Sequence, residues 1–142
     1  MKVSDWLLAH PALPVTVDPD ADIGRVAERF LAYPCLRDIY IATTDGRLRG
    51  CIRHRRLTRI ILAEHLPIQT SHEIMERVSG GAARDLMDRD FVSAHPDEEI
   101  DNVLHRMLEY EVEDMPVFDS EHRIIGNINL TEVMRAALNG DL

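Results

Sequence analysis

Residues 114–133 read D-M-P-V-F-D-S-E-H-R-I-I-G-N-I-N-L-T-E-V, and residues 38–57 read D-I-Y-I-A-T-T-D-G-R-L-R-G-C-I-R-H-R-R-L. The two stretches share an Asp, an apolar run, a polar turn, an Arg and a Gly in the same order, at an offset of 76. Upstream of them, residues 15–33 and 92–110 correspond in the same way at an offset of 77. A repeat of this kind is a structural unit whose apolar face needs a neighbour. We therefore expect two copies of one fold, related by a pseudo-twofold axis, with equivalent clefts where they meet.

The pattern within each copy predicts a small α+β unit. A proline and acidic residues precede apolar residues at helical spacing, which is typical of a helix start. A short β-rich run, a polar turn and a second apolar run then predict a β-hairpin. A second amphipathic helix closes each copy, so that a small sheet carries helices on one face. The expected elements are β-prone segments at 15–17 and 92–94, helices over 23–33 and 100–110, hairpins over 38–52 and 115–129, and closing helices over 57–64 and 131–138.

Short leaders and a linker complete the predicted order. The leaders are V-S-D-W-L at residues 3–7 and A-R-D-L-M at residues 83–87. Residues 67–78 predict a linker helix, which Gly80-Gly81 closes. The predicted division of the chain is a first repeat over residues 1–64, a linker over residues 65–82 and a second repeat over residues 83–142.

Negative charge is concentrated in the second half of the chain. Residues 77–142 carry 15 acidic and 6 basic side chains, whereas residues 1–76 carry 10 of each. Nucleic-acid affinity comes largely from neutralising phosphates, so a chain with a net charge of -9 is a poor general nucleic-acid binder. Six of the 16 basic residues nevertheless crowd into one short stretch, where their forked donors suit phosphate or carboxylate. They are Arg47, Arg49, Arg53, Arg55, Arg56 and Arg59.

Nothing in the sequence predicts a membrane span or a disulfide scaffold. No run approaches the roughly 18 apolar residues that a spanning helix needs, and the first residues lack the features of a signal peptide. Cys35 and Cys51 are too few for a disulfide framework and do not form a C-x-x-C pair. We therefore expect a reducing, cytoplasmic location.

No spacing of reactive side chains predicts catalysis or a metal centre. His65 and His72 can share a helix face, but no Cys or carboxylate pattern completes a zinc site. Asp119, Glu121 and His122 fall in a predicted hairpin turn, where polar side chains are ordinary. We therefore predict no catalytic residue, no metal ligand and no enzyme activity.

The ordered set of motifs resembles the cystathionine-β-synthase (CBS) domain, and the two copies in tandem resemble a Bateman module. The resemblance rests on the two leaders, on V-T-V-D-P-D-A-D-I at residues 15–23 and on residues 114–133. It implies two β-α-β-β-α repeats with adenosine-type ligands in the clefts between them. It also implies regulation of an enzyme, a transporter or another partner. The ligands that the resemblance suggests are AMP, ADP, ATP and S-adenosylmethionine, with no resident cofactor required.

In this family the second hairpin strand leads into Gly, two apolar residues, Thr or Ser, two variable residues and Asp. The hydroxyl handles phosphate and the carboxylate accepts hydrogen bonds from the ribose. Here the first copy has Arg53 at the hydroxyl position and Arg56 at the acid position, whereas the second has Asn129 and Glu132. A lost carboxylate removes a charged hydrogen bond worth about 1.5–3 kcal/mol. The resemblance therefore implies one working nucleotide site, in the second repeat.

Our hypothesis assigns Glu132 to the ribose and Asn129 to the phosphate, with arginines of the first repeat assisting. Simpler interpretations stay open: the apolar candidates fill the core, the arginines are solvated or pair with acids, and Glu132 serves the helix start. The candidate ligand residues are Val92, Ser93, Met115, Pro116, Asn129, Thr131 and Glu132 in the second repeat, and Val15, Thr16, Ile39, Arg53, Arg55 and Arg56 in the first.

Two functions stay open at this point. In one, the chain is a regulatory nucleotide sensor that acts in trans on a partner protein. In the other, it is a structural dimerisation or adaptor module with degenerate, ligand-free clefts. We expect a homodimer, held by apolar helix faces unless these faces belong to the core of the chain itself. The faces are Leu57, Ile60 and Ile61 in the first repeat and Val133, Ala136 and Ala137 in the second.

Overall fold

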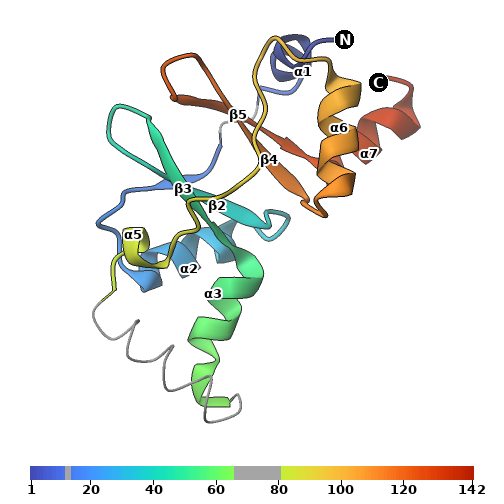
Figure 1. The fold of residues 1–142 in the computed structure, drawn as a ribbon. Coiled ribbons are helices and arrows are strands. Elements are labelled where there is room, and N and C mark those ends of the chain that lie inside the picture. The colour runs from blue at the N-terminus through green and yellow to red at the C-terminus, as the bar shows by residue number, and fades with distance from the viewer. Residues whose placement is uncertain (12–13, 66–80) are drawn as a thin grey trace. The chain divides into compact units, whose positions relative to one another are not determined.

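The chain divides into two units, each built around one of the repeats (Figure 1). The computed structural model describes residues 1–11, 14–65 and 81–142. The predicted linker helix over residues 67–78 lies outside these described residues. Unit 1 comprises Met1–Pro14, Asp45–Leu48 and Val92–Leu142, and unit 2 comprises Val15–Thr44 and Arg49–Phe91.

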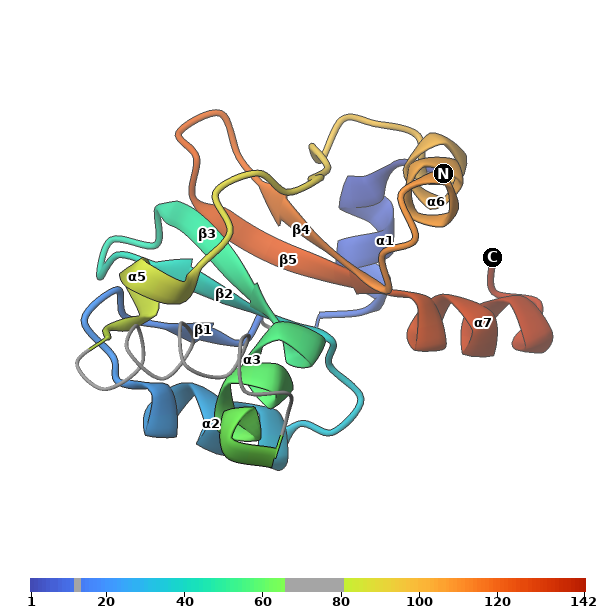
Figure 2. The same ribbon diagram turned by 60° about the horizontal axis from the view of Figure 1, so that its bottom comes forward.

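Unit 2 contains a three-stranded sheet with helices packed on one face (Figure 2). The strand order is β1-β2-β3, and β1 runs parallel to β2 with Thr16 opposite Tyr40. Apolar side chains of the strands and helices form one core cluster, which includes Val26, Ile41 and Leu57. The elements are β1 (Thr16–Val17), α2 (Ile23–Ala32), β2 (Asp38–Ala42), β3 (Leu48–Arg53), α3 (His54–Ile61), the 3-10 helix η1 (Ala63–His65) and α5 (Ala83–Leu86).

Unit 1 repeats this plan with a two-stranded antiparallel sheet. Asp114 lies opposite Asn129, and Ala94 adds a single parallel bridge to Val117. The predicted β-prone segment at 92–94 is thus reduced to one bridge. The elements are α1 (Val3–Ala9), α6 (Ile100–Glu109), β4 (Asp114–Phe118), β5 (Ile124–Asn129) and α7 (Leu130–Asn139).

The sequence did not predict which repeat each of the two leaders packs against. Helix α1, which precedes the first repeat, belongs to unit 1, and α5, which precedes the second repeat, belongs to unit 2. The backbone N–H of Val3 donates to the carbonyl of Glu98 at 2.9 Å. In the same way Ala83 donates to Ala21 at 2.7 Å. Each leader therefore completes the core of the repeat that it does not precede, and Trp6 is fully buried there.

A glycine in each hairpin lets the exchanged leader come close. An added Cβ at Gly126 would lie 2.5 Å from Cδ2 of Leu7 in α1. At Gly50 it would lie 2.6 Å from the backbone carbonyl oxygen of Asp88, which follows α5. Both distances are too short for a real Cβ. A glycine without a side chain is what permits the close approach in both units.

The predicted helices over 23–33 and 100–110 are confirmed as α2 and α6, and the predicted hairpins are confirmed as β2–β3 and β4–β5. The closing helices α3 and α7 start earlier than expected, because β3 and β5 run directly into them. No helix among the described residues has the length and apolar character needed to cross a membrane. Of the six apolar residues predicted to form dimer faces on the closing helices, four are buried in the cores: Leu57, Ile60, Val133 and Ala136.

Candidate ligand-binding site

The turn from β5 into α7 carries three predicted ligand residues of the second repeat. Oδ1 of Asn129 accepts hydrogen bonds from the backbone N–H groups of Thr131 at 2.9 Å and Glu132 at 3.4 Å. Asn129 is thus the N-cap of α7, and it satisfies donors that a helix start leaves unpaired. Thr131 is exposed and Glu132 is half-buried in the first turn. The cap fixes the backbone that presents both side chains.

A buried carboxylate supports this turn. Asp114 is 1% exposed, and its Oδ1 accepts hydrogen bonds from Nδ2 of Asn129 at 2.6 Å and Nδ2 of Asn127 at 3.1 Å. Such donors are needed because a carboxylate loses its hydration when it is buried. The amide nitrogen of Asn129 carries two hydrogens, and the bond to Asp114 uses one of them. Asp114 therefore orients Asn129 so that its oxygen faces the start of α7.

The segment before α6 and the strand β4 contain the residues predicted to contact a base. Val92 is partly buried against the core of unit 1, and the carbonyl of Ser93 accepts a hydrogen bond from Nη1 of Arg106 at 2.7 Å. Met115 is fully buried within the core cluster, and Pro116 is also buried. Of these four residues, Val92 and Ser93 keep partial exposure.

Sequence reasoning missed Arg106, which fixes this segment from α6. Its Nη2 forms an ion pair with Oε1 of Glu98, and its Nη1 holds the carbonyl of Ser93. The other carboxylate oxygen of Glu98 accepts the backbone N–H of His95 at 2.7 Å. The available signal was the repeat itself, because Arg29 occupies the equivalent position in α2.

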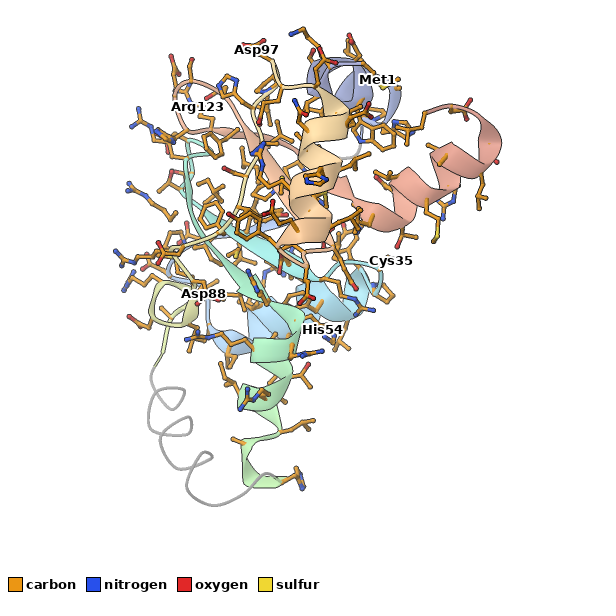
Figure 3. The ribbon with its side chains drawn as sticks, turned by 45° about the vertical axis from the view of Figure 1, so that its right-hand side comes forward. Met1, Cys35, His54, Asp88, Asp97 and Arg123 are labelled. Atoms are coloured by element: carbon orange, nitrogen blue, oxygen red, sulfur yellow. The ribbon has the colours of Figure 1, made fainter. Side chains whose placement is uncertain are left out.

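The arginines of the first repeat begin α3 (Figure 3, in which His54 marks the start of the helix). Arg53 and Arg55 are exposed. Nη1 of Arg56 lies 3.1 Å from Oδ1 of Asp88 in an ion pair. Arg56 stands at the position where the family pattern has its ribose-binding acid. Its positive charge is already balanced by the carboxylate of Asp88 in the same unit.

The other candidates of the first repeat belong to its sheet. The carbonyl of Val15 accepts a hydrogen bond from the backbone N–H of Tyr40 at 3.1 Å. Thr16 is half-buried in β1, and Ile39 is fully buried in the core. Asp38, the residue equivalent to Asp114, is also buried.

Cys51 occupies the position equivalent to Asn127 and is buried in β3. Burial, and after it the charge of Asp38, raises the pKa of the Cys51 thiol from 9.0 to about 12, while Arg53 opposes the shift. The thiol is therefore protonated at neutral pH and is a poor nucleophile.

Because the unfolded chain loses the Cys51 proton at a lower pH than the folded chain, stability should fall as pH rises from 9.0 to about 12. Below pH 9.0 this contribution is fully present. Urea unfolding followed by circular dichroism across this range measures it. Cys51→Ala should show a shallower decline, whereas Cys35→Ala, at an exposed thiol, should decline like the original chain. Equal slopes in all three would contradict the assignment.

Among residues 1–11, 14–65 and 81–142, no group of three or more His, Cys, Asp or Glu side chains is placed to hold a metal ion. Of the two histidines considered in the sequence, His72 lies outside the described residues.

The fold and the turns at the starts of α3 and α7 identify the class of protein. The family model of the CBS domain matches residues 12–63 and 83–139. The chain therefore belongs to the CBS-domain family, and it carries two copies of the domain. It is 26% identical over 121 residues to inosine-5'-monophosphate dehydrogenase of Methanocaldococcus jannaschii. That match covers 85% of this chain but 21% of the dehydrogenase, so the chain spans about a fifth of this relative's length.

Solved structures share the fold over nearly the whole chain. A CBS domain-containing protein of Thermotoga maritima is 26% identical, with a TM-score of 0.75 over 96% of this chain and 93% of its own. CBSX2, solved in complex with AMP, is 18% identical, with a TM-score of 0.77 over 99% and 98%. The CBS domain pair of protein MJ0100, in complex with 5-methylthioadenosine and S-adenosyl-L-methionine, is 20% identical, with a TM-score of 0.73 over 100% and 98%. These likenesses establish the tandem CBS fold.

Proposed function

We propose that this protein is a non-catalytic regulatory module whose second repeat binds an adenosine-type nucleotide, and that binding modulates a partner protein in trans. The observation that carries the proposal is the capped turn at the start of α7. It holds the half-buried carboxylate of Glu132 on a backbone fixed by Asn129. The complexes of CBSX2 with AMP and of MJ0100 with S-adenosyl-L-methionine support this ligand class.

Within the proposal, Glu132 accepts hydrogen bonds from the ribose hydroxyls. The free hydrogen of the Asn129 amide and the exposed Thr131 hydroxyl donate to phosphate. Val92 and Ser93 contact the base, beside the buried Met115 and Pro116. Roles for the first-repeat residues stay predictions, and Arg56 among them is paired with Asp88. These residues are Val15, Thr16, Ile39, Arg53, Arg55 and Arg56.

The test is a thermal-shift titration of the purified protein with AMP, ADP, ATP and S-adenosylmethionine. A ligand that binds only the native state raises the melting temperature as its concentration rises above the dissociation constant. At least one of the four should do so. If none shifts the transition at millimolar concentration, the sensor proposal fails.

Replacing Glu132 with Ala should weaken binding of the active ligand by roughly ten- to a hundredfold, because a charged hydrogen bond to the ribose is lost. Isothermal titration calorimetry measures the change. The matched control is Glu109→Ala, which removes an exposed acid from α6 and should leave affinity unchanged. Equal affinities of the Glu132 and Glu109 variants would move the site elsewhere.

A second candidate function is a dimerisation or adaptor module without ligand. The feature that favours it is the basic first repeat, in which Arg53 and Arg56 replace the hydroxyl and the acid of the family pattern. The exposed apolar side chains Met134 and Leu138 on α7 support a homodimer. Light scattering on the ligand-free protein distinguishes the two: a stable dimer that no nucleotide stabilises favours the adaptor.

We also propose a cytoplasmic location, which the free thiols of Cys35 and Cys51 support.

A further inference from the structure

The two repeats place an arginine at the same point of equivalent helices. Arg29 in α2 and Arg106 in α6 stand at the same distance from the starts of their helices. The turns before these helices also match, because the carbonyls of Ala21 and Glu98 each accept the first backbone N–H of a leader helix. The surroundings of the two arginines can therefore be compared position by position.

In the second repeat the guanidinium has two partners in its own unit. Nη2 of Arg106 forms an ion pair with Glu98, and Nη1 donates to the carbonyl of Ser93 at 2.7 Å. The side chains of Arg106 and Glu98 are 28% and 32% exposed, so the pair is largely shielded from water. A guanidinium offers charge-assisted donors of this kind to an oxyanion.

In the first repeat the carboxylate is missing, because Ala21 stands where the second repeat has Glu98. Nε of Arg29 is buried, and no atom of the described residues accepts a hydrogen bond from it. A buried donor without an acceptor costs the free energy of its lost hydration. The first repeat thus has the arginine without the glutamate that pairs with it in the second repeat.

Nearby carboxylates of the first repeat are engaged elsewhere. Asp20 pairs with Arg84, and Glu28 lies 3.6 Å from Arg25. Oδ1 of Asp22 accepts the backbone N–H of Arg25 at 2.8 Å. Oδ1 of Asp18 likewise accepts the backbone N–H of Asp20 at 2.8 Å. These contacts hold the acids around the helix start in local caps and surface pairs.

We propose that Arg29 binds an oxyanion, a carboxylate or a phosphate, that comes from outside the first repeat and takes the place of the Glu98 carboxylate. Ala21 is partly exposed, and its methyl group is shorter than the glutamate side chain at the equivalent position of the second repeat. The site belongs to unit 2, whereas the proposed nucleotide site on α7 belongs to unit 1, and it gives the two repeats different anion chemistry at equivalent positions.

The experiment follows the Nε–Hε resonance of Arg29 by ¹H–¹⁵N NMR, with Arg29→Gln to assign it. Inorganic phosphate or acetate at millimolar concentration should shift this resonance saturably, whereas chloride at equal ionic strength should not. Ala21→Glu should weaken the response at least tenfold, because it restores the internal counter-ion. Glu98→Ala should create the same response at Arg106.

Each result decides the proposal. A shift with phosphate, acetate or both supports it, and the stronger of the two identifies the chemistry of the group. The proposal is overturned if neither anion shifts the resonance, if chloride shifts it equally, or if Ala21→Glu responds like the original chain. Glu132→Ala should leave the Arg29 response unchanged, so a failure of the nucleotide site is distinguished from a failure here.

Discussion

Replacing Trp6 with Ala should lower the free energy of unfolding of unit 1 by about 3–5 kcal/mol, which is the usual cost of emptying a large buried aromatic site. Trp6 is fully buried although it lies in the leader before the first repeat. Its ring packs within the core of the second repeat, beside residues such as Val103 and Met115. Loss of the ring should therefore destabilise the second repeat, which is distant in sequence.

Hydrogen exchange read by mass spectrometry measures this effect for each unit. Amides of α6 and β5 should exchange faster in Trp6→Ala, whereas those of β2 should not. Leu8→Ala is the matched control in the same helix, because Leu8 is 81% exposed. Trp6→Phe should cost less than Trp6→Ala, because the indole nitrogen has no partner among the described residues. Faster hydrogen exchange confined to β2 would contradict the packing of α1 in unit 1.

Replacing Gly50 with Ala should destabilise unit 2 by about 3 kcal/mol, at the upper end of the cost of overpacking. The new Cβ would meet the backbone carbonyl oxygen of Asp88 at 2.6 Å and Sδ of Met87 at 2.8 Å. A backbone atom cannot move aside alone, because Cys51 and Asp88 exchange backbone hydrogen bonds at 3.0 and 2.8 Å. The substitution should therefore displace the segment after α5.

The comparison variant is Gly126→Ala, at the equivalent position of unit 1. Its Cβ would meet the methyl end of Leu7, a flexible side chain that can rotate away. We expect a smaller loss, measurable as a difference between the two variants in urea midpoint. A larger loss for Gly126→Ala than for Gly50→Ala would show that side-chain crowding, not the backbone contact, controls the fit.

The repeat made most of the fold predictable from sequence. Helix and hairpin positions followed from local patterns, since periodicity and turn residues act over short distances. The β-prone segment predicted at residues 92–94 was less accurate, because Ala94 makes only a single bridge to Val117. The packing of α1 against Glu98 was not predictable, because the two copies carry similar leaders and either one fits the pattern.

The candidate site was predictable in its residue types but less so in its contacts. The positions of Asn129 and Glu132 followed from the family pattern, and a role of Glu132 at the helix start was among the interpretations considered. The network that orients them was not visible, because the partners of Asp114 are set by strand register. Arg106 was missed because the acidic residues before α6, Glu98 among them, were interpreted only as a helix start. The pairing of Arg56 with Asp88 likewise joins segments far apart in sequence.

The exchange of leaders also affects how the chain folds during synthesis. Helix α1 leaves the ribosome before the second repeat does, but the core that receives Trp6 is complete only after residues 92–136 have been made. Contacts between such distant segments slow folding, because the loop between them must close first. Until then the indole stays exposed to water and to other nascent chains. Unit 2, whose segments from Val15 to Phe91 are made earlier, can fold before unit 1.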